Sequence, residues 1–281
     1  MAADAYASLG VRRIVLAREM TLAQIAELRR RCTRELELEV FAHGSMCMAY
    51  SGRCMISAAL TGRSANRGAC TQSCRWNYAL MEEKRPGQYF PVFEDERGMS
   101  ILSSNDLCTL PFLDQLLACG IGSCKIEGRM KSAYYVATVT NAYRRRLDAI
   151  KAQEASDIDA LMRELSCVSH RAYSSGFYFS EAIHAMPDAG VYEQECIFTA
   201  IVTEFSASGR VCFEARNRLE EGTTVEVLSP HLLGARFIAE NITDVSGKRV
   251  SCADRPSEGY EMDCPYPLEP GDILRVRLAH P

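Results

Sequence analysis

The chain has 281 residues, of which 47% are hydrophobic and 24% are charged, and its net charge is −4. This composition excludes a disordered, collagen-like or low-complexity protein, and the length suffices for two domains. No apolar run approaches the roughly 20 residues that span a bilayer, and residues 1–20 carry acidic and arginine side chains in place of a secretory signal. The acidic balance gives no general attraction to nucleic acid, although it permits a local basic patch. We expect a cytoplasmic protein without a membrane segment.

Strands and helices alternate in the first half of the chain. Thr21 is expected to cap a helix over residues 22–30, where apolar residues recur at helical spacing. Further helices are expected around Leu113 and after Lys131. Short apolar runs that end at polar residues predict strands over 11–17, 36–41, 99–102 and 121–126.

This alternation is typical of a parallel α/β fold, in which function gathers at the carboxyl ends of the strands. Only about four strand–helix units fit before residue 150, whereas a complete eightfold barrel needs about 250 residues. The residues therefore predict an α/β architecture over residues 1–150 that is either half of a (β/α) barrel or another α/β fold.

The character of the chain changes after residue 150. Residues 151–193 read as a connecting helix and loop. Residues 194–281 contain short alternating or β-branched runs separated by turn signals such as Ser208-Gly209 and Pro270-Gly271. This spacing predicts a small all-β barrel domain.

The chain contains 13 cysteines. An odd count without an export signal favours a reducing compartment, where clustered cysteines more often bind metal than form disulfides. Cys47, Cys54, Cys70 and Cys74 lie in a loop rich in Gly, Ser, Asn and Arg, with the spacing C-x6-C-x15-C-x3-C. Four thiolates suit zinc or an iron–sulfur cluster. Because only the second pair resembles a zinc knuckle, the spacing favours a [4Fe–4S] cluster, with zinc as the alternative.

The remaining cysteines lie in or beside apolar runs and are expected to be structural. Cys124 falls inside a predicted strand and is assigned to the core. Cys108 follows a strand end, so it is an alternative to one of the four ligands. The opposing hypothesis for the clustered four is that each is a small buried hydrophobic residue.

Several blocks of the sequence resemble one known family. EVFAHGSMCMAYSGRCMIS (39–57) and KIEGRMKSAYYVATVTNAYR (125–144) resemble the two signature blocks of the peptidase U32 family, the collagenase-like proteases. VSHRAYSSGFYF (168–179) and NRLEEGTTVEVLSP (217–230) resemble its later portion and its C-terminal β domain. Among its subgroups, the chain is most similar to the tRNA uridine hydroxylation proteins.

The resemblance implies a TIM-like (β/α) barrel, of which residues 1–150 would form the C-terminal half, followed by a β-barrel domain. It also implies a [4Fe–4S] cluster on Cys47, Cys54, Cys70 and Cys74, and hydroxylation of the tRNA wobble uridine with prephenate as co-substrate. The first ten residues resemble sequence from the middle of the family's barrel. We therefore expect that the first strand–helix units are missing, and that a preceding segment or a partner completes the barrel.

On this hypothesis, polar residues at the strand ends converge on the rim that carries the cluster. His43, Lys125, Glu127 and Arg129 are the candidate catalytic residues, and Arg18 and Glu19 are candidate substrate-binding residues. Lys125 and Arg129 would bind a carboxylate substrate such as prephenate. The alternative for these cations is a structural salt bridge to an acid such as Glu19 or Glu127.

A basic segment with interleaved aromatic residues is the candidate contact for tRNA. Arg63, Arg67 and Arg75 are assigned to substrate binding, and Lys84 and Arg85 extend the basic run. Trp76 and Tyr78 lie between them, and such a pattern suits phosphate contacts together with base stacking.

Two other functions remain open. A peptidase needs an activated nucleophile, but the chain lacks a GxSxG elbow and an HExxH helix. His43 with nearby Ser45 is its best candidate, and a structural His43 that bonds to the cysteine loop is the alternative. The last hypothesis is a non-catalytic fragment or subunit that carries the cluster.

Overall fold

The computed structural model describes residues 2–33, 35–46, 51–76, 79–80, 90–91, 105–179 and 192–278. By its internal contacts the chain divides into two compact units. The N-terminal unit consists of residues 1–129 and 170–192, and the C-terminal unit consists of residues 130–169 and 193–281. The domain boundaries expected at residues 150 and 193 remain predictions.

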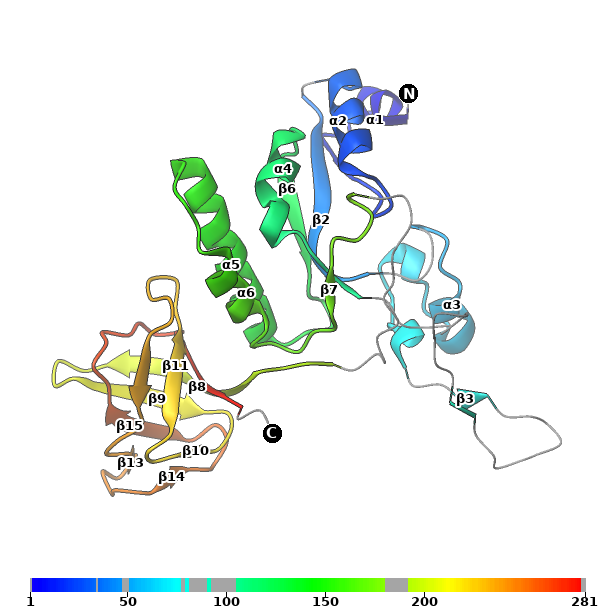
Figure 1. The fold of residues 1–281 in the computed structure, drawn as a ribbon. Helices are drawn as coiled ribbons and strands as arrows, with labels where there is room; N and C mark the ends of the chain where they lie inside the picture. The colour runs from blue at the N-terminus through cyan, green and yellow to red at the C-terminus, as the bar shows by residue number, and fades with distance from the viewer. Residues whose placement is uncertain are drawn as a thin grey trace. The chain divides into compact units, whose positions relative to one another are not determined.

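The N-terminal unit is built around strand β2 (Glu37–Ser45) (Figure 1). Strands β1 (Arg13–Val15) and β6 (Ser123–Glu127) pair with β2 in parallel, as the sequence predicts. Strand β5 (Asp106–Cys108) pairs with β2 in the antiparallel sense, and β7 (Tyr173–Ser174) runs parallel to β5. The result is a five-stranded mixed sheet, so the described strands do not confirm a partial TIM-like barrel.

Strand β5 was not predicted from the sequence. It begins at Asp106, which is fully buried. Its carboxylate accepts a hydrogen bond from the backbone N–H of Arg171, which compensates the burial. The strand expected over 99–102 lies outside the described residues.

Short helices accompany the sheet, and the expected start of the first one is confirmed. Thr21 caps α2 (Leu22–Arg31): its hydroxyl accepts the Gln24 N–H at 3.2 Å, and the Gln24 side chain accepts the Thr21 N–H at 3.0 Å. The remaining short elements of this unit are α1 (Ala2–Ser8), α3 (Ile56–Thr61), η1 (Ala65–Arg67), η2 (Ser73–Arg75), β3 (Ala79–Leu80), β4 (Phe90–Pro91), η3 (Leu110–Phe112) and α4 (Leu113–Ala118).

Strands β2 and β6 approach each other very closely at Gly44. Gly44 has φ +109°, a region that favours glycine, and a Cβ on it would lie 2.3 Å from the carbonyl oxygen of Glu127. The strand register shifts just before this point, between Phe41 and His43. The close approach fixes the end of β6 against the end of β2.

The C-terminal unit joins two helices to a β sheet. Helix α5 (Ala133–Ala152), which was expected after Lys131, buries Tyr134, Tyr135 and Val139. Helix α6 (Ile158–Leu165) follows. Within the described residues, no helix is long and apolar enough to cross a membrane.

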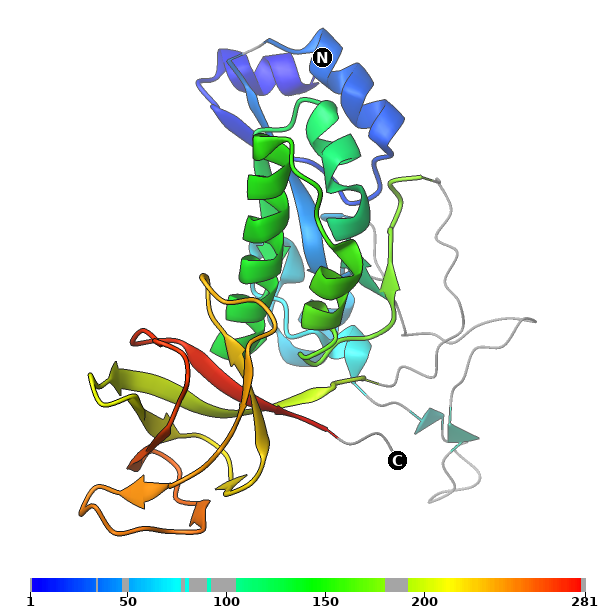
Figure 2. The ribbon, with the colours of Figure 1, turned by 60° about the vertical axis from the view of Figure 1, so that its left-hand side comes forward.

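The sheet of this unit has seven antiparallel strands in the order β12-β11-β16-β8-β9-β15-β13, which confirms a small all-β region. Figures 1 and 2 show that the strands curl around a shared interior. Phe213, Met262 and Leu274 are among its buried core residues. The strands are β8 (Cys196–Phe205), β9 (Arg210–Ala215), β11 (Thr224–Leu228), β12 (Arg236–Ile238), β13 (Thr243–Asp244), β15 (Gly259–Asp263) and β16 (Ile273–Arg277), with a separate pair β10 (Leu219–Glu220) and β14 (Cys252–Ala253).

The Gly44 approach gives a stability prediction. We expect Gly44→Ala to lower the free energy of unfolding by about 2 kcal/mol or more, because the new methyl group meets a backbone carbonyl at a strained φ. Gly122→Ala is the control, since its Cβ would lie 3.5 Å from the nearest atom, and a change under about 1 kcal/mol is expected. Urea unfolding measures both. Equal losses in the two variants would contradict the steric account.

Candidate functional site

A cavity of about 600 Å³ lies in the N-terminal unit. Three chain segments form most of its wall: the end of β2, the stretch 51–74 that follows it, and the end of β6 with the two residues beyond. The sulfur-bearing and ionisable residues that line the cavity are Cys54, Cys70, Cys74, Arg18, Lys125, Glu127 and Arg129. Seven of the predicted site residues therefore meet at one cavity.

Side chain–backbone hydrogen bonds hold the segment that carries the cysteines. The Cys54 N–H donates to the Asn66 amide oxygen, and the Asn66 amide N–H donates back to the Cys54 carbonyl, each at 3.0 Å. The Ser57 hydroxyl accepts the Thr71 N–H at 3.2 Å. These contacts join Cys54 to the stretch that contains Cys70.

Arg129 holds the same segment from the other side. Its guanidinium donates to the backbone carbonyls of Gly68 and Cys70, so its planar fork connects the end of β6 to the cysteine segment. The next residues bend so that the Gln72 N–H donates to the Cys70 sulfur at 3.3 Å. Arg129 is thus engaged by the protein backbone, a role that the sequence did not indicate.

Two cations lie close to one aromatic ring at the cavity wall. The Arg18 guanidinium carbon lies 3.9 Å from the centre of the Phe41 ring, and the Lys125 ammonium lies 5.2 Å from it. Arg18 also donates to the Ser45 carbonyl at 3.2 Å and lies 3.9 Å from the Glu127 carboxylate. Among the described lining residues Glu127 is the one carboxylate beside three cations, so the wall favours an anion.

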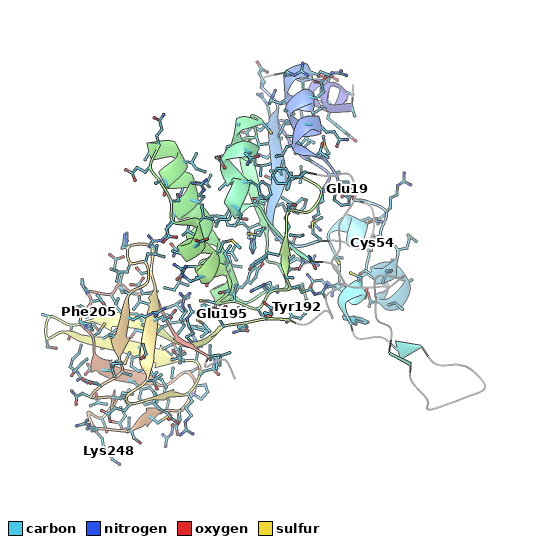
Figure 3. The ribbon with its side chains drawn as sticks, in the orientation of Figure 1. Glu19, Cys54, Tyr192, Glu195, Phe205 and Lys248 are labelled. Atoms are coloured by element: carbon cyan, nitrogen blue, oxygen red, sulfur yellow. The ribbon has the colours of Figure 1, made fainter. Side chains whose placement is uncertain are left out.

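The other predicted site residues that the structure describes do not line the cavity. His43 is buried, packs against the Tyr173 ring at 5.2 Å between centroids, and does not line the cavity. The Glu19 carboxylate accepts the Ser51 N–H at 2.7 Å, which ties it to the start of the cysteine segment (Figure 3). Arg63 and Arg67 are exposed outside the lining.

Some predictions fall where the structure gives no test. Cys47, Tyr78, Lys84 and Arg85 lie outside the described residues, as does the side chain of Arg75. The assignment of the first cluster ligand therefore remains a prediction.

Two other cysteines, the alternative ligand Cys108 and the predicted core residue Cys124, lie in strands of the N-terminal sheet. Burial raises the pKa of the Cys124 thiol to about 11, so this strand residue keeps its proton at neutral pH. Cys108 is buried in β5 opposite His43 and is not among the cavity-lining residues.

The cavity suits a metal group held by thiolates, because three thiols, a backbone donor to one sulfur and three cations share its wall. Within the described residues, only Cys167, Cys196 and Glu226 form a set of three or more potential ligand atoms within 4.8 Å of one another. The cavity thiols are therefore spread more widely than a single tetrahedral ion requires.

Sequence reasoning did not single out Phe41 or Asn66. Phe41 is an aromatic residue within β2, and Asn66 is one polar residue among many in the cysteine segment. Neither position carries a spacing signal, so only the fold reveals their contacts.

Comparison with known protein families assigns the chain to one family. The model of peptidase family U32 matches residues 1–186, and that of the peptidase family U32 C-terminal domain matches residues 194–275. The chain belongs to peptidase family U32.

The family contains relatives with different names. The chain is 30% identical over 306 aligned residues to tRNA hydroxylation protein P of Escherichia coli, which covers 93% of this chain and 66% of that protein. It is 43% identical over 142 residues to the 23S rRNA 5-hydroxycytidine C2501 synthase of Escherichia coli, covering 50% of this chain and 20% of the synthase. It is 30% identical over 233 residues to the collagenase of Porphyromonas gingivalis, covering 77% and 55%. The chain thus spans about two thirds of the first relative's length.

The Arg129 contacts give a local prediction for this U32 chain. We expect Arg129→Met to speed backbone amide exchange across residues 64–72 about tenfold, because two charge-assisted hydrogen bonds are lost. Hydrogen–deuterium exchange with mass spectrometry measures this. Arg63→Met, at an exposed position on the same segment, should leave the exchange unchanged. Equal effects of the two substitutions would show that Arg129 does not hold the segment.

Proposed function

We propose that this chain takes part in RNA base hydroxylation, with the tRNA wobble uridine as substrate and a [4Fe–4S] cluster as cofactor. The observation that carries the proposal is the single cavity shared by three thiols and the cationic ends of two strands. Two of the relatives described above are named for RNA hydroxylation, which supports the same reaction class.

The cluster would be held by Cys54, Cys70 and Cys74, with Cys47 as the fourth ligand. When bound, it supplies one-electron chemistry that amino-acid side chains lack. The three surrounding cations balance the negative charge of a thiolate-ligated cluster, and Arg129 fixes the backbone at Gly68 and Cys70 so that the thiols stay in place.

The proposed co-substrate is prephenate, because its two carboxylates match the cations of the cavity wall. Arg18 and Lys125 lie near Phe41, and an anion between them would be held by charge-assisted hydrogen bonds. Glu127 lies 3.9 Å from Arg18 and is the candidate proton acceptor on the wall. The exposed Arg63 and Arg67 are proposed to contact tRNA phosphates.

A peptidase mechanism has less support from the geometry. It needs a nucleophile next to a general base, and the described residues that line the cavity include no histidine. His43 lies buried away from that wall. The assays below distinguish an enzyme from a non-catalytic protein that only carries a cluster.

The first assay concerns the cofactor. Anaerobically purified protein is expected to carry about four iron and four sulfide per chain, and Cys54→Ala, Cys70→Ala and Cys74→Ala should each lose most of both. Cys252→Ala, in the C-terminal unit, is the control and should retain the wild-type iron and sulfide content. Stoichiometric zinc without sulfide would rule out the proposed cluster.

The second assay concerns the reaction. The full-length gene is expected to restore 5-hydroxyuridine in the tRNA of a deletion strain, as measured by nucleoside mass spectrometry. Lys125→Met should reduce it at least tenfold while iron content is retained, because substrate anion binding is lost. Lys248→Met, at an exposed position in the C-terminal unit, should have no effect.

Two outcomes of this assay would contradict the proposal. If cluster-loaded wild-type protein forms no hydroxyuridine, the protein is a non-catalytic carrier. If it degrades gelatin instead, it is a peptidase.

A further inference from the structure

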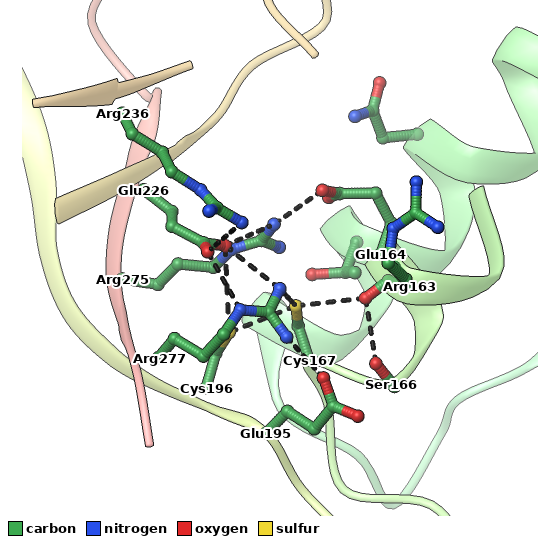
Figure 4. Close-up of polar contacts among 12 residues, drawn as sticks. Arg163, Glu164, Ser166, Cys167, Glu195, Cys196, Glu226, Arg236, Arg275 and Arg277 are labelled. Atoms are coloured by element: carbon green, nitrogen blue, oxygen red, sulfur yellow. Dashed lines mark hydrogen bonds and ion pairs between the residues drawn. The ribbon is translucent and has the colours of Figure 1, made fainter. Parts of the chain in front are cut away.

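A second group of reactive side chains lies in the C-terminal unit, independent of the proposed function. Cys167, two residues beyond the end of α6, faces Cys196, the first residue of β8, with 3.1 Å between their sulfur atoms (Figure 4). Both side chains are fully buried. The fold therefore brings together two thiols that the sequence analysis assigned to the core.

The surroundings make the two thiols unequal. Cys196 donates its S–H to Cys167, and an Arg277 N–H donates to the same Cys167 sulfur at 3.4 Å. The hydrogen bond from Cys196 lowers the pKa of Cys167 despite burial, and Arg275 and Arg277 lower it further. The same hydrogen bond, together with burial, raises the pKa of Cys196. Cys167, whose S–H also donates to the Arg163 carbonyl at 3.3 Å, is thus the thiol of the pair that loses its proton more readily.

A bound metal ion explains this group less well. The Glu226 carboxylate completes a set of three potential ligands within 4.8 Å of one another. However, its two oxygens already accept from arginines: one from Arg277 at 2.9 Å and Arg236 at 2.8 Å, the other from Arg275 at 3.3 Å. Three guanidinium groups around the carboxylate oppose a further cation. The charges favour a thiolate without a metal.

We propose that Cys167 and Cys196 form a peroxide-sensitive dithiol that closes reversibly to a disulfide within the C-terminal unit. The Cys167 thiolate attacks one oxygen of hydrogen peroxide, the O–O bond breaks, and the released hydroxide takes a proton to become water. The Cys196 sulfur then attacks the Cys167 sulfenic acid, and the Cys196 proton leaves with the hydroxyl group as a second water. Two thiols are oxidised by two electrons, and one peroxide is reduced to two waters.

The burial of Cys167 and Cys196 favours a small oxidant. Neither sulfur is exposed, but the Arg277 side chain is 30% exposed and connects the Cys167 sulfur to the surface, where it forms an ion pair with Glu195. Because both sulfurs are buried, the oxidant we propose is a small molecule such as hydrogen peroxide and not a bulky disulfide such as oxidised glutathione. This access suits a sensor of peroxide better than an exchange partner of thiol proteins.

The location gives the disulfide a structural consequence. The chain leaves the C-terminal unit after residue 169 and returns at residue 193, so Cys167 and Cys196 flank the stretch that contributes β7 to the other unit. Closing the bond ties the end of α6 to the start of the β sheet. The oxidised C-terminal unit should therefore unfold at a higher temperature than the reduced one.

The test uses the full chain treated with hydrogen peroxide, alkylated under denaturing conditions and mapped by mass spectrometry. We expect a peptide linked through Cys167 and Cys196 that dithiothreitol removes, with a higher Tm for the oxidised form. In Cys196→Ala, Cys167 should accumulate sulfinic acid, whereas in Cys167→Ala, Cys196 should remain a thiol. Arg277→Met should slow formation of the linked peptide several-fold, and the control Cys212→Ala should leave the rate unchanged.

Three results would overturn the proposal. The first is recovery of both cysteines fully alkylated after peroxide treatment of folded wild-type protein. The second is stoichiometric zinc that copurifies with the wild-type protein and is absent from Cys196→Ala. The third is oxidation of Cys167 in the wild-type protein to sulfinic acid without any linked peptide. The wild-type measurements decide the matter even where a cysteine variant fails to fold.

Discussion

The candidate site depends on the close approach of β2 and β6 at Gly44. No other residue fits where a Cβ would lie 2.3 Å from the Glu127 carbonyl, and the positive φ of Gly44 excludes most side chains independently. This contact sets the end of β6 beside the end of β2. Lys125, Glu127 and Arg129 therefore reach the cavity, and the cysteine segment begins only a few residues beyond Gly44.

Charge is balanced differently in the two units. In the cavity the cations outnumber the one described carboxylate, an excess that thiolates or an anionic substrate can compensate. Around Cys167 and Cys196, arginines instead pair with Glu164, Glu195 and Glu226. The cavity can therefore bind an anion, whereas the arginines around Cys167 and Cys196 are already paired with carboxylates. The hydrogen bond from Cys196, together with these arginines, lowers the pKa of the buried Cys167 thiol.

Local signals predicted much of the fold. Thr21 capped its helix as expected, because a cap depends on a few neighbouring residues. The gathering of Cys54, Cys70 and Cys74 with the ends of β1 and β6 followed from strand ends meeting at one edge of a sheet. Strand β5 and its antiparallel pairing with β2 were not predicted, because such pairing is decided by contacts between distant residues.

The same limit applies to the side chains. Arg129 was expected to bind a carboxylate, but it donates to two backbone carbonyls about sixty residues earlier in the chain. Cys167 and Cys196 were assigned separately to the core, because nothing in their spacing shows that they touch. A sequence pattern indicates which residue types are present, while their partners depend on the folded chain.

The most direct test of the account is anomalous diffraction at the iron edge from anaerobically grown crystals of the full-length protein. We predict a strong iron peak inside the cavity, within bonding distance of the sulfurs of Cys54, Cys70 and Cys74. Iron bound elsewhere, or a zinc signal at these sulfurs, would contradict the assignment of this cavity as the cluster site.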